Sequence, residues 1–157
     1  DDYITSSFGR SSVNLIAGTT ADTVTDLQTM GDGTFYDVAE ATGTPGINLE
    51  VKFTGVTAFE KARVLGVYEG SATHAVAIQM YNWSVPQWDT FNALQNHHAD
   101  VATANGYILG NHEFTVYDDT NYIGTGVNLG VSTVRFYHTD AGNSSHDLHI
   151  DECSLRQ

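Results

Sequence analysis

The sequence is short of basic residues. It contains 6 lysines and arginines against 19 aspartates and glutamates, which gives a formal net charge of −13. Nucleic acids and anionic membrane surfaces are bound through basic patches, so this composition argues against nucleic acid and membrane insertion alike. An acidic surface keeps protein molecules soluble because like charges repel each other, and this explains the composition. The more specific alternative is a surface that binds hard cations such as calcium.

A second cysteine and a long apolar run are also missing. Cys153 is the only cysteine, which excludes an internal disulfide, and its apolar neighbours predict a buried, unreactive thiol. No run of about 18 apolar residues indicates a membrane-spanning helix, and we recognise neither a signal peptide nor a lipidation motif. Because the sequence begins at Asp1 and not at methionine, we expect a processed product or a piece of a longer chain.

What is present is typical of one β-rich domain. A length of 157 residues fits a single core, hydrophobic residues make up 41% of the chain, and 15 glycines supply turns. Threonine and valine are frequent, and both suit strands because they are branched at Cβ. We expect residues 1–20 to form an N-terminal arm or first strand, and residues 21–157 to form the folded domain.

Alternation of polar and apolar residues predicts the strands. About eight short strands separated by turns indicate an all-β fold, an antiparallel two-sheet β-sandwich of jelly-roll type, with a barrel as the alternative. Residues 96–109 are expected to form a loop, and a tight turn at 118–121 is expected to lead into a short returning strand. The clearest predicted strands are "INLEVKFTGV" (47–56), "ARVLGVYEG" (62–70), "THAVAIQMYNW" (73–83), "WDTFNAL" (88–94), "GVSTVRFYHT" (130–139) and "HDLHIDECSL" (146–155).

The stretch "YNWSVPQWDTF" (81–91) concentrates aromatic rings and holds both tryptophans of the chain. Period two puts Tyr81 and Trp83 opposite an aliphatic set, and Trp88 lies just past a turn as a cross-strand neighbour. Three alternatives follow: the rings pack in the interior, they form a protein interface, or they stack against a sugar. Gln87 and Asp89 would then supply hydrogen bonds to hydroxyl groups, although an ordinary turn also explains them.

The order of these segments resembles a known type of domain. A strand ending in "YEG", then "THAVAIQMYNW", "WDTF" and "VRFYHTDAGNSSHDLHIDECSL", is similar to jelly-roll domains of bacteriophage virion proteins such as tail fibres, adhesins and capsid decorations. "FYDVAEATG" and "HIDECSL" resemble the first and last strands of jelly-roll carbohydrate-binding modules. In that wider group a structural calcium is commonly shared by two carboxylates, which the resemblance places at Glu40 and Asp151.

Histidines offer a second candidate metal site. His138 and His146 flank the last predicted turn, and His74 begins another strand, so that three imidazoles could hold zinc. Neutral histidines hydrogen-bonded to the backbone are the alternative, because no short ligand spacing is present. The segment "NHHAD" (96–100) could also bind a metal, but a solvated loop explains it.

Catalytic motifs are not recognisable in the sequence. It contains no nucleophile elbow, P-loop or dinucleotide fingerprint, and nothing singles out a pair of carboxylates for glycoside hydrolysis. We therefore expect a non-enzymatic, extracellular domain displayed on a virion surface, which acts in attachment, contacts glycans, and forms homo-oligomers or binds other virion subunits. The alternatives are a carbohydrate-binding module of a secreted polysaccharide-degrading enzyme and a self-assembling extracellular fibre subunit.

Overall fold

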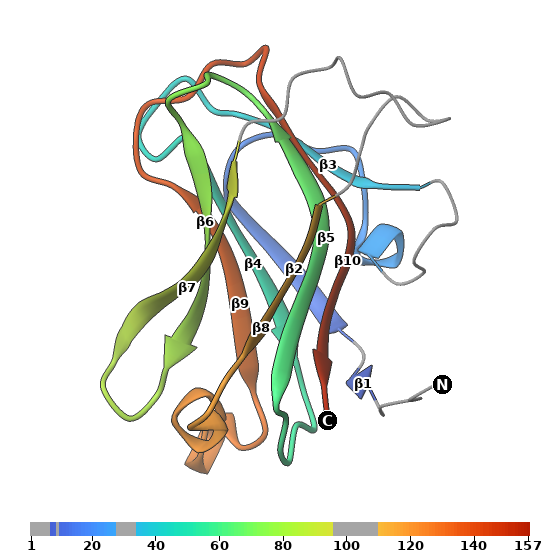
Figure 1. The fold of residues 1–157 in the computed structure, drawn as a ribbon, viewed down its shortest axis with the longest axis vertical. Coiled ribbons are helices and arrows are strands. Elements are labelled where there is room, and N and C mark those ends of the chain that lie inside the picture. The colour runs from blue at the N-terminus through green and yellow to red at the C-terminus, as the bar shows by residue number, and fades with distance from the viewer. Residues whose placement is uncertain (1–6, 9, 28–33, 96–109) are drawn as a thin grey trace.

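The computed structural model describes residues 7–8, 10–27, 34–95 and 110–157 (Figure 1). The loop predicted at 96–109, which includes the "NHHAD" segment, lies outside these described residues. No helix within the described ranges has the length and apolar character that crossing a membrane requires.

Two antiparallel sheets form the domain, which confirms the predicted β-sandwich. Sheet A has the order β1-β10-β5-β8, with β3 also paired to β10, and sheet B has the order β2-β4-β9-β6-β7. The two sheets lie face to face in Figure 1, and the 3-10 helices of residues 119–122 and 126–128 sit together at one end. The elements are β1 (Ser7–Phe8), β2 (Arg10–Ala17), η1 (Val24–Leu27), β3 (Tyr36–Ala39), β4 (Ile47–Phe53), β5 (Lys61–Glu69), β6 (Ala75–Asn82), β7 (Gln87–Gln95), β8 (Gly110–Thr115), η2 (Asp119–Tyr122), η3 (Gly126–Asn128), β9 (Ser132–His138) and β10 (Asp147–Arg156).

The core lies between the sheets and follows the period-two pattern of the sequence. In β6 and β9, alternate side chains are buried and the others are partly exposed. Val76, Ile78 and Met80 of β6 are fully buried, as predicted, and pack with Val134 and Phe136 of β9. Each buried aliphatic or aromatic side chain contributes roughly 1.5–3 kcal/mol, so this inner layer holds the sheets together.

Cys153 belongs to the same core. Its thiol is fully buried and unpaired in β10. Burial, the largest influence, raises the pKa of this thiol to about 12, and a thiol that stays protonated is a poor nucleophile. The prediction of a buried, unreactive cysteine is confirmed.

The prediction of a short returning strand after the turn at 118–121 is wrong. The chain instead forms η2 and η3 before it enters β9. Gly126 and Gly130 have φ angles of +60° and +73°, a conformation that glycine adopts without steric cost. These two positions bend the segment into consecutive tight turns, so it caps one end of the sandwich and does not extend a sheet.

Candidate functional site

Three aromatic side chains gather on the outer face of sheet B. Tyr81 and Trp88 are cross-strand partners in β6 and β7, and their ring centroids lie 5.2 Å apart. Trp83 follows β6 and packs edge-on against Tyr81 at 4.8 Å. We call these residues the aromatic trio; each is partly exposed, because the rings cover one another and face away from the core.

The trio lines a shallow cleft on this face. Glu50 and Thr133, from β4 and β9, complete its lining, and its volume is about 250 Å³. The main chain of Trp83 is fixed from outside the sheet, since its N–H donates to the carbonyl of Asn121 at 2.7 Å. The cleft therefore has an aromatic wall, one carboxylate and one hydroxyl, all on regular strands or anchored to them.

A row of polar side chains crosses the sheet beside the trio. The strand register aligns Glu50 with Arg135, Arg135 with Gln79, and Gln79 with Thr90. Arg135 Nε donates to Gln79 Oε1 at 2.8 Å, and Gln79 Nε2 donates to Thr90 Oγ1 at 3.0 Å. Arg135, Gln79 and Thr90 are thus joined by hydrogen bonds that orient them before any ligand arrives, and Glu50 lies beside Arg135 in the register.

Arg135 joins this row to the aromatic rings. Its guanidinium carbon lies 4.2 Å from the ring centroid of Trp88 and 4.0 Å from that of Tyr137. Such cation–π contacts contribute about 0.5–2 kcal/mol each and hold the rings in place. Burial lowers the pKa of Arg135, and Tyr137 and Glu50 act in the opposite direction.

Two of the residues predicted to bind a ligand lie elsewhere. Asp89 faces the other side of β7 from Trp88, because neighbouring strand residues alternate. Its Oδ2 accepts hydrogen bonds from Asn82 Nδ2 and the Tyr122 hydroxyl, both at 2.8 Å, and its Oδ1 accepts one from Gln87 at 2.6 Å. The hydrogen bond from Asn82 is the largest reason why the pKa of Asp89 is lowered. The structure therefore gives Asp89 and Gln87 a bracing role at the hairpin end and does not bring them into the aromatic cleft.

Glu40 and Asp151 do not meet. The main chain of Glu40 pairs with His146, and β3 then runs antiparallel to β10, so Asp151 lies five residues further along β10. That separation is roughly 16 Å at about 3.3 Å per residue, whereas two ligands of one calcium ion lie within about 5 Å of each other. These carboxylates do not fit a shared calcium ion. Calcium held by other residues stays a prediction.

Glu40 instead anchors a buried polar network. Its Oε1 accepts a hydrogen bond from the Tyr68 hydroxyl at 2.6 Å, and its Oε2 accepts one from the main-chain N–H of Asn143 at 2.8 Å. His146 Nδ1 lies 3.1 Å from Oε2. Burial acts to raise the pKa of Glu40, but the hydrogen bonds and the two nearby histidines, His138 and His146, lower it more, so the net shift is downward.

The three histidines predicted as a possible zinc site divide between two places. His74 and His138 come together with their ring centroids 4.8 Å apart. His146 contacts Glu40 from the other side and is 22% exposed. The structure thus brings two of the three imidazoles into contact.

A different histidine has carboxylate partners on both sides. His149 Nδ1 lies 2.6 Å from Asp37 Oδ1, and its Nε2 lies 3.3 Å from Glu69 Oε2. Burial acts to lower the pKa of His149, but the hydrogen bonds and charges of Asp37 and Glu69 outweigh it and raise the pKa. His149 is therefore a buried imidazole in sheet A whose two carboxylate neighbours favour its protonated form.

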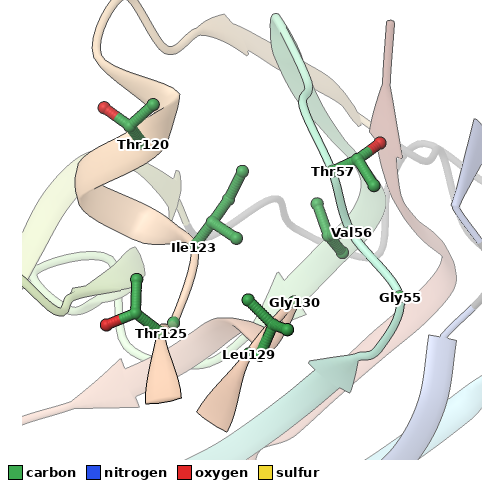
Figure 2. Close-up of a pocket in the computed structure, with 9 residues that line it drawn as sticks. Gly55, Val56, Thr57, Thr120, Ile123, Thr125, Leu129 and Gly130 are labelled. Atoms are coloured by element: carbon green, nitrogen blue, oxygen red, sulfur yellow. The ribbon is translucent and has the colours of Figure 1, made fainter.

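An apolar pocket lies at the end of the sandwich, between the β4–β5 connection and η2–η3 (Figure 2). Its volume is about 520 Å³, and Val56, Ile123 and Leu129 point into it. The described residues that line it are aliphatic, glycine or threonine, so they supply neither an acid nor a base.

The two antiparallel sheets define a β-sandwich. No protein-family model matches the sequence, and no curated protein matches it. A mutant of a family 29 carbohydrate-binding module is similar with a TM-score of 0.53 and 13% identity, over 96% of this chain and 89% of that one. Another mutant of that module, complexed with cellulohexaose, gives 0.52 and 14%, over 93% and 91%. A family 35 module from an environmental isolate gives 0.42 and 14%, over 96% and 87%. At these identities the first two establish the fold, and the third adds no argument.

Sequence reasoning missed part of the aromatic face. Thr133, Arg135 and Tyr137 alternate in "GVSTVRFYHT" and therefore share one side of a strand, which was a visible signal. What the sequence did not reveal is that this strand lies beside β6, so that Arg135 reaches Trp88.

Proposed function

We propose that this domain is a non-catalytic module that binds neutral glycans on the outer face of sheet B. The observation that carries the proposal is the aromatic trio, which is partly exposed beside an ordered row of hydrogen-bonding side chains. Sugar rings present an apolar C–H face and a rim of hydroxyls. An aromatic wall next to fixed polar groups matches both parts.

The polar row supports orientation as well as affinity. Gln79, Thr90 and Arg135 are already hydrogen-bonded to one another, and side chains ordered before binding lose less conformational entropy when the ligand arrives. Glu50 and Thr133 line the cleft and offer an acceptor and a hydroxyl. A sugar stacked on Trp88 would meet these groups at its rim.

Charge favours an uncharged ligand. A net charge of −13 repels uronic acid and sulfated polymers at long range. The guanidinium of Arg135 is occupied by Gln79 and the two rings beside it. The family 29 neighbour was complexed with cellulohexaose, so a neutral β-glucan oligosaccharide is a reasonable first probe for this domain.

A glycan array followed by affinity electrophoresis tests the proposal. The double variant Trp83→Ala/Trp88→Ala should lose retention on neutral glycans, with little change in melting temperature because both rings are partly exposed. Tyr117→Ala is the matched control, because Tyr117 is an aromatic residue that is 91% exposed elsewhere on the surface. Undiminished retention of the double variant, or binding confined to anionic glycans, would refute the proposal.

We further propose that the module is displayed extracellularly on a virion and serves attachment. The resemblance of "THAVAIQMYNW" and the C-terminal segment to phage virion domains supports this setting, in which homo-oligomers or other virion subunits would be partners. A module of a secreted polysaccharide-degrading enzyme is the alternative, and the aromatic face suits it equally well. Binding to whole bacterial cells in preference to purified plant polysaccharide would favour attachment, and the reverse preference would favour the enzyme module.

A further inference from the structure

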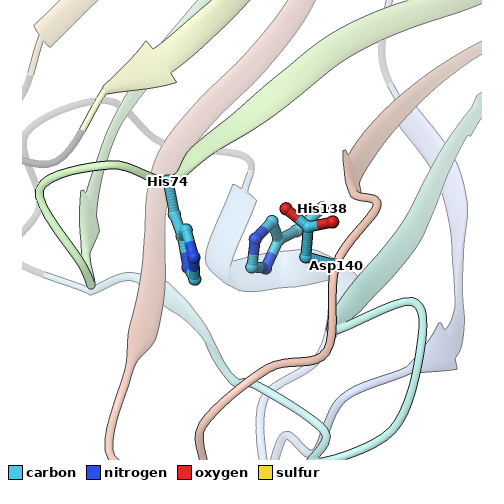
Figure 3. Close-up of side chains that lie close together, drawn as sticks. All are labelled: His74, His138 and Asp140. Atoms are coloured by element: carbon cyan, nitrogen blue, oxygen red, sulfur yellow. The ribbon is translucent and has the colours of Figure 1, made fainter.

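A second group of side chains converges at the end of β9, away from the aromatic face. His74 lies just before β6, His138 ends β9, and Asp140 follows in the next loop. One ring nitrogen of each histidine and one carboxylate oxygen of Asp140 all lie within 4.8 Å of one another. Figure 3 shows the two imidazoles facing each other, with the carboxylate of Asp140 beside His138.

The imidazole of His138 is buried, and that of His74 is partly exposed with a buried Nδ1. His138 is 2% exposed. Among the described residues, neither of its ring nitrogens has a hydrogen-bond partner, and the buried Nδ1 of His74 has none either. Burying an unsatisfied polar atom costs about 1–3 kcal/mol. Nδ1 of His138 faces Glu40, so Nε2 of His138 and Nδ1 of His74 are the two atoms that indicate a partner other than the described residues.

A buried carboxylate stands behind His138. Glu40 Oε1 lies 2.7 Å from Nδ1 of His138, although the angles miss those of a hydrogen bond. A carboxylate against one ring nitrogen is the usual outer support of a histidine that binds a metal through the other nitrogen. Tyr68 fixes Glu40 in turn through its 2.6 Å hydrogen bond.

The backbone of the neighbouring loop holds His138 and Asp140 near each other. The N–H of Gly46 donates to the carbonyls of both His138 and Asp140, at 3.0 and 2.7 Å. A Cβ added at Gly46 would stand 2.8 Å from Nδ1 of His138. The backbone around the two residues is therefore pinned, while the carboxylate of Asp140 remains exposed and free to adjust.

We propose that His74, His138 and Asp140 bind a transition-metal ion of the zinc type. Two imidazoles and one carboxylate form a ligand set that suits zinc, whereas calcium prefers oxygen ligands alone. Tetrahedral zinc needs ligand atoms about 3.3 Å apart, so a small rotation of the Asp140 side chain closes the site. Nε2 is the nitrogen of His138 that remains for the ion, and water takes the fourth position.

A neighbouring cluster provides the internal contrast. Glu69, Asp147 and His149 also lie within 4.8 Å of one another. Both ring nitrogens of His149 already face carboxylates there, Asp37 on one side and Glu69 on the other. His149 directs both ring nitrogens at carboxylate oxygens and leaves neither for a metal, so we assign the ion to the His138 cluster alone.

The test is zinc titration of the metal-stripped protein, followed by calorimetry and by competition with a chromophoric chelator. Wild type should bind one zinc ion per chain, gain melting temperature, and keep the ion in excess calcium. His74→Ala and Asp140→Asn should each weaken binding by at least roughly 100-fold, the upper end of the loss that an outer support causes. Cobalt substitution should give a visible absorption band that both variants lose.

Two controls separate this site from its neighbours. His146→Ala, which removes a Glu40 contact outside the cluster, and His149→Gln should both bind zinc as wild type does. Should His74→Ala fail to fold, Asp140→Asn decides alone, because Asp140 is exposed. No zinc binding by wild type, unchanged binding in Asp140→Asn, or loss of binding in His149→Gln would each overturn the proposal.

Discussion

The charged side chains on the outer faces of the two sheets have different kinds of partner. On sheet A, charged side chains pair with one another: Lys61 with Glu113 at 3.2 Å, and Arg156 with Glu152 at 3.1 Å. His149 adds a buried imidazole flanked by two carboxylates. Lys61–Glu113 joins β5 to β8, and His149 joins β10 to β3 and β5, whereas Arg156–Glu152 lies within β10.

Sheet B places aromatic rings where sheet A places ion pairs. Its one arginine in this region, Arg135, contacts two rings and a glutamine amide, and the trio stays partly exposed. Charged groups that pair with each other are not available to a ligand, whereas partly exposed rings retain apolar surface that a ligand can cover. This contrast locates the proposed binding face on sheet B.

The largest expected effect is the difference in stability loss between substitutions on the two sides of β9. Phe136 is fully buried between the sheets, so Phe136→Ala should lower the unfolding free energy by about 3–5 kcal/mol. Arg135→Ala, one residue earlier and on the outer side, should lower it by less than about 2 kcal/mol. Urea denaturation measures both values. Equal losses of unfolding free energy would mean that the outer side chains of β9 contribute as much to stability as its core side chains.

The next effect concerns glycan affinity. Arg135→Ala removes the contact that orients Trp88 and breaks the hydrogen bond to Gln79, so we expect affinity to fall by about tenfold, or ~1.4 kcal/mol. Arg63→Ala is the matched control on the outer face of sheet A. Isothermal titration calorimetry compares the two variants. A larger loss of glycan affinity in Arg63→Ala than in Arg135→Ala would place the binding face on sheet A instead of sheet B.

A smaller effect is a pH dependence that originates in sheet A. Because the folded pKa of His149 is raised above its ordinary value of 6.5, its contribution to stability is complete below pH 6.5 and is lost as the pH rises through the folded pKa. The stability difference between wild type and His149→Gln should therefore shrink as the pH rises above about 6.5. A difference that grows with pH would show that His149 is neutral in the folded state.

The smallest effect is expected at the exposed ion pair of sheet A. Lys61 and Glu113 are 47% and 35% exposed, and such pairs contribute about 0.2–1 kcal/mol. Lys61→Ala should therefore change the unfolding free energy by less than about 1 kcal/mol, and high salt should abolish the change. A loss well above that value, at any salt concentration, would mean that sheet A depends on this pair.

Local pattern was enough to predict the strands and the orientation of Tyr81 and Trp83, because period two is a property of each strand alone. It also placed Trp88 as a cross-strand neighbour, because a short hairpin joins the two strands. The position of Arg135 against Trp88 required knowledge of which strand lies next to β6, and that pairing joins residues 56 positions apart.

Long-range contacts explain the remaining differences. The resemblance placed Glu40 beside Asp151 at a shared calcium ion, but Glu40 meets Tyr68 and His146 instead, since the β3–β10 register cannot be deduced from either segment. Asp140 was not distinguished from other loop carboxylates, because its proximity to His74 depends on the β6–β9 pairing. Gln87 and Asp89 were chosen for closeness in sequence, and strand alternation turns Asp89 to the opposite side.

Tryptophan fluorescence during glycan titration tests the central claim most directly. Trp83 and Trp88 are the only tryptophans in the chain, and both belong to the aromatic trio, so the emission reports on that surface alone. We predict that a neutral glycan selected from an array shifts the emission saturably, with the same dissociation constant that calorimetry gives. Glycan binding measured by calorimetry with no change in tryptophan emission would contradict the assignment.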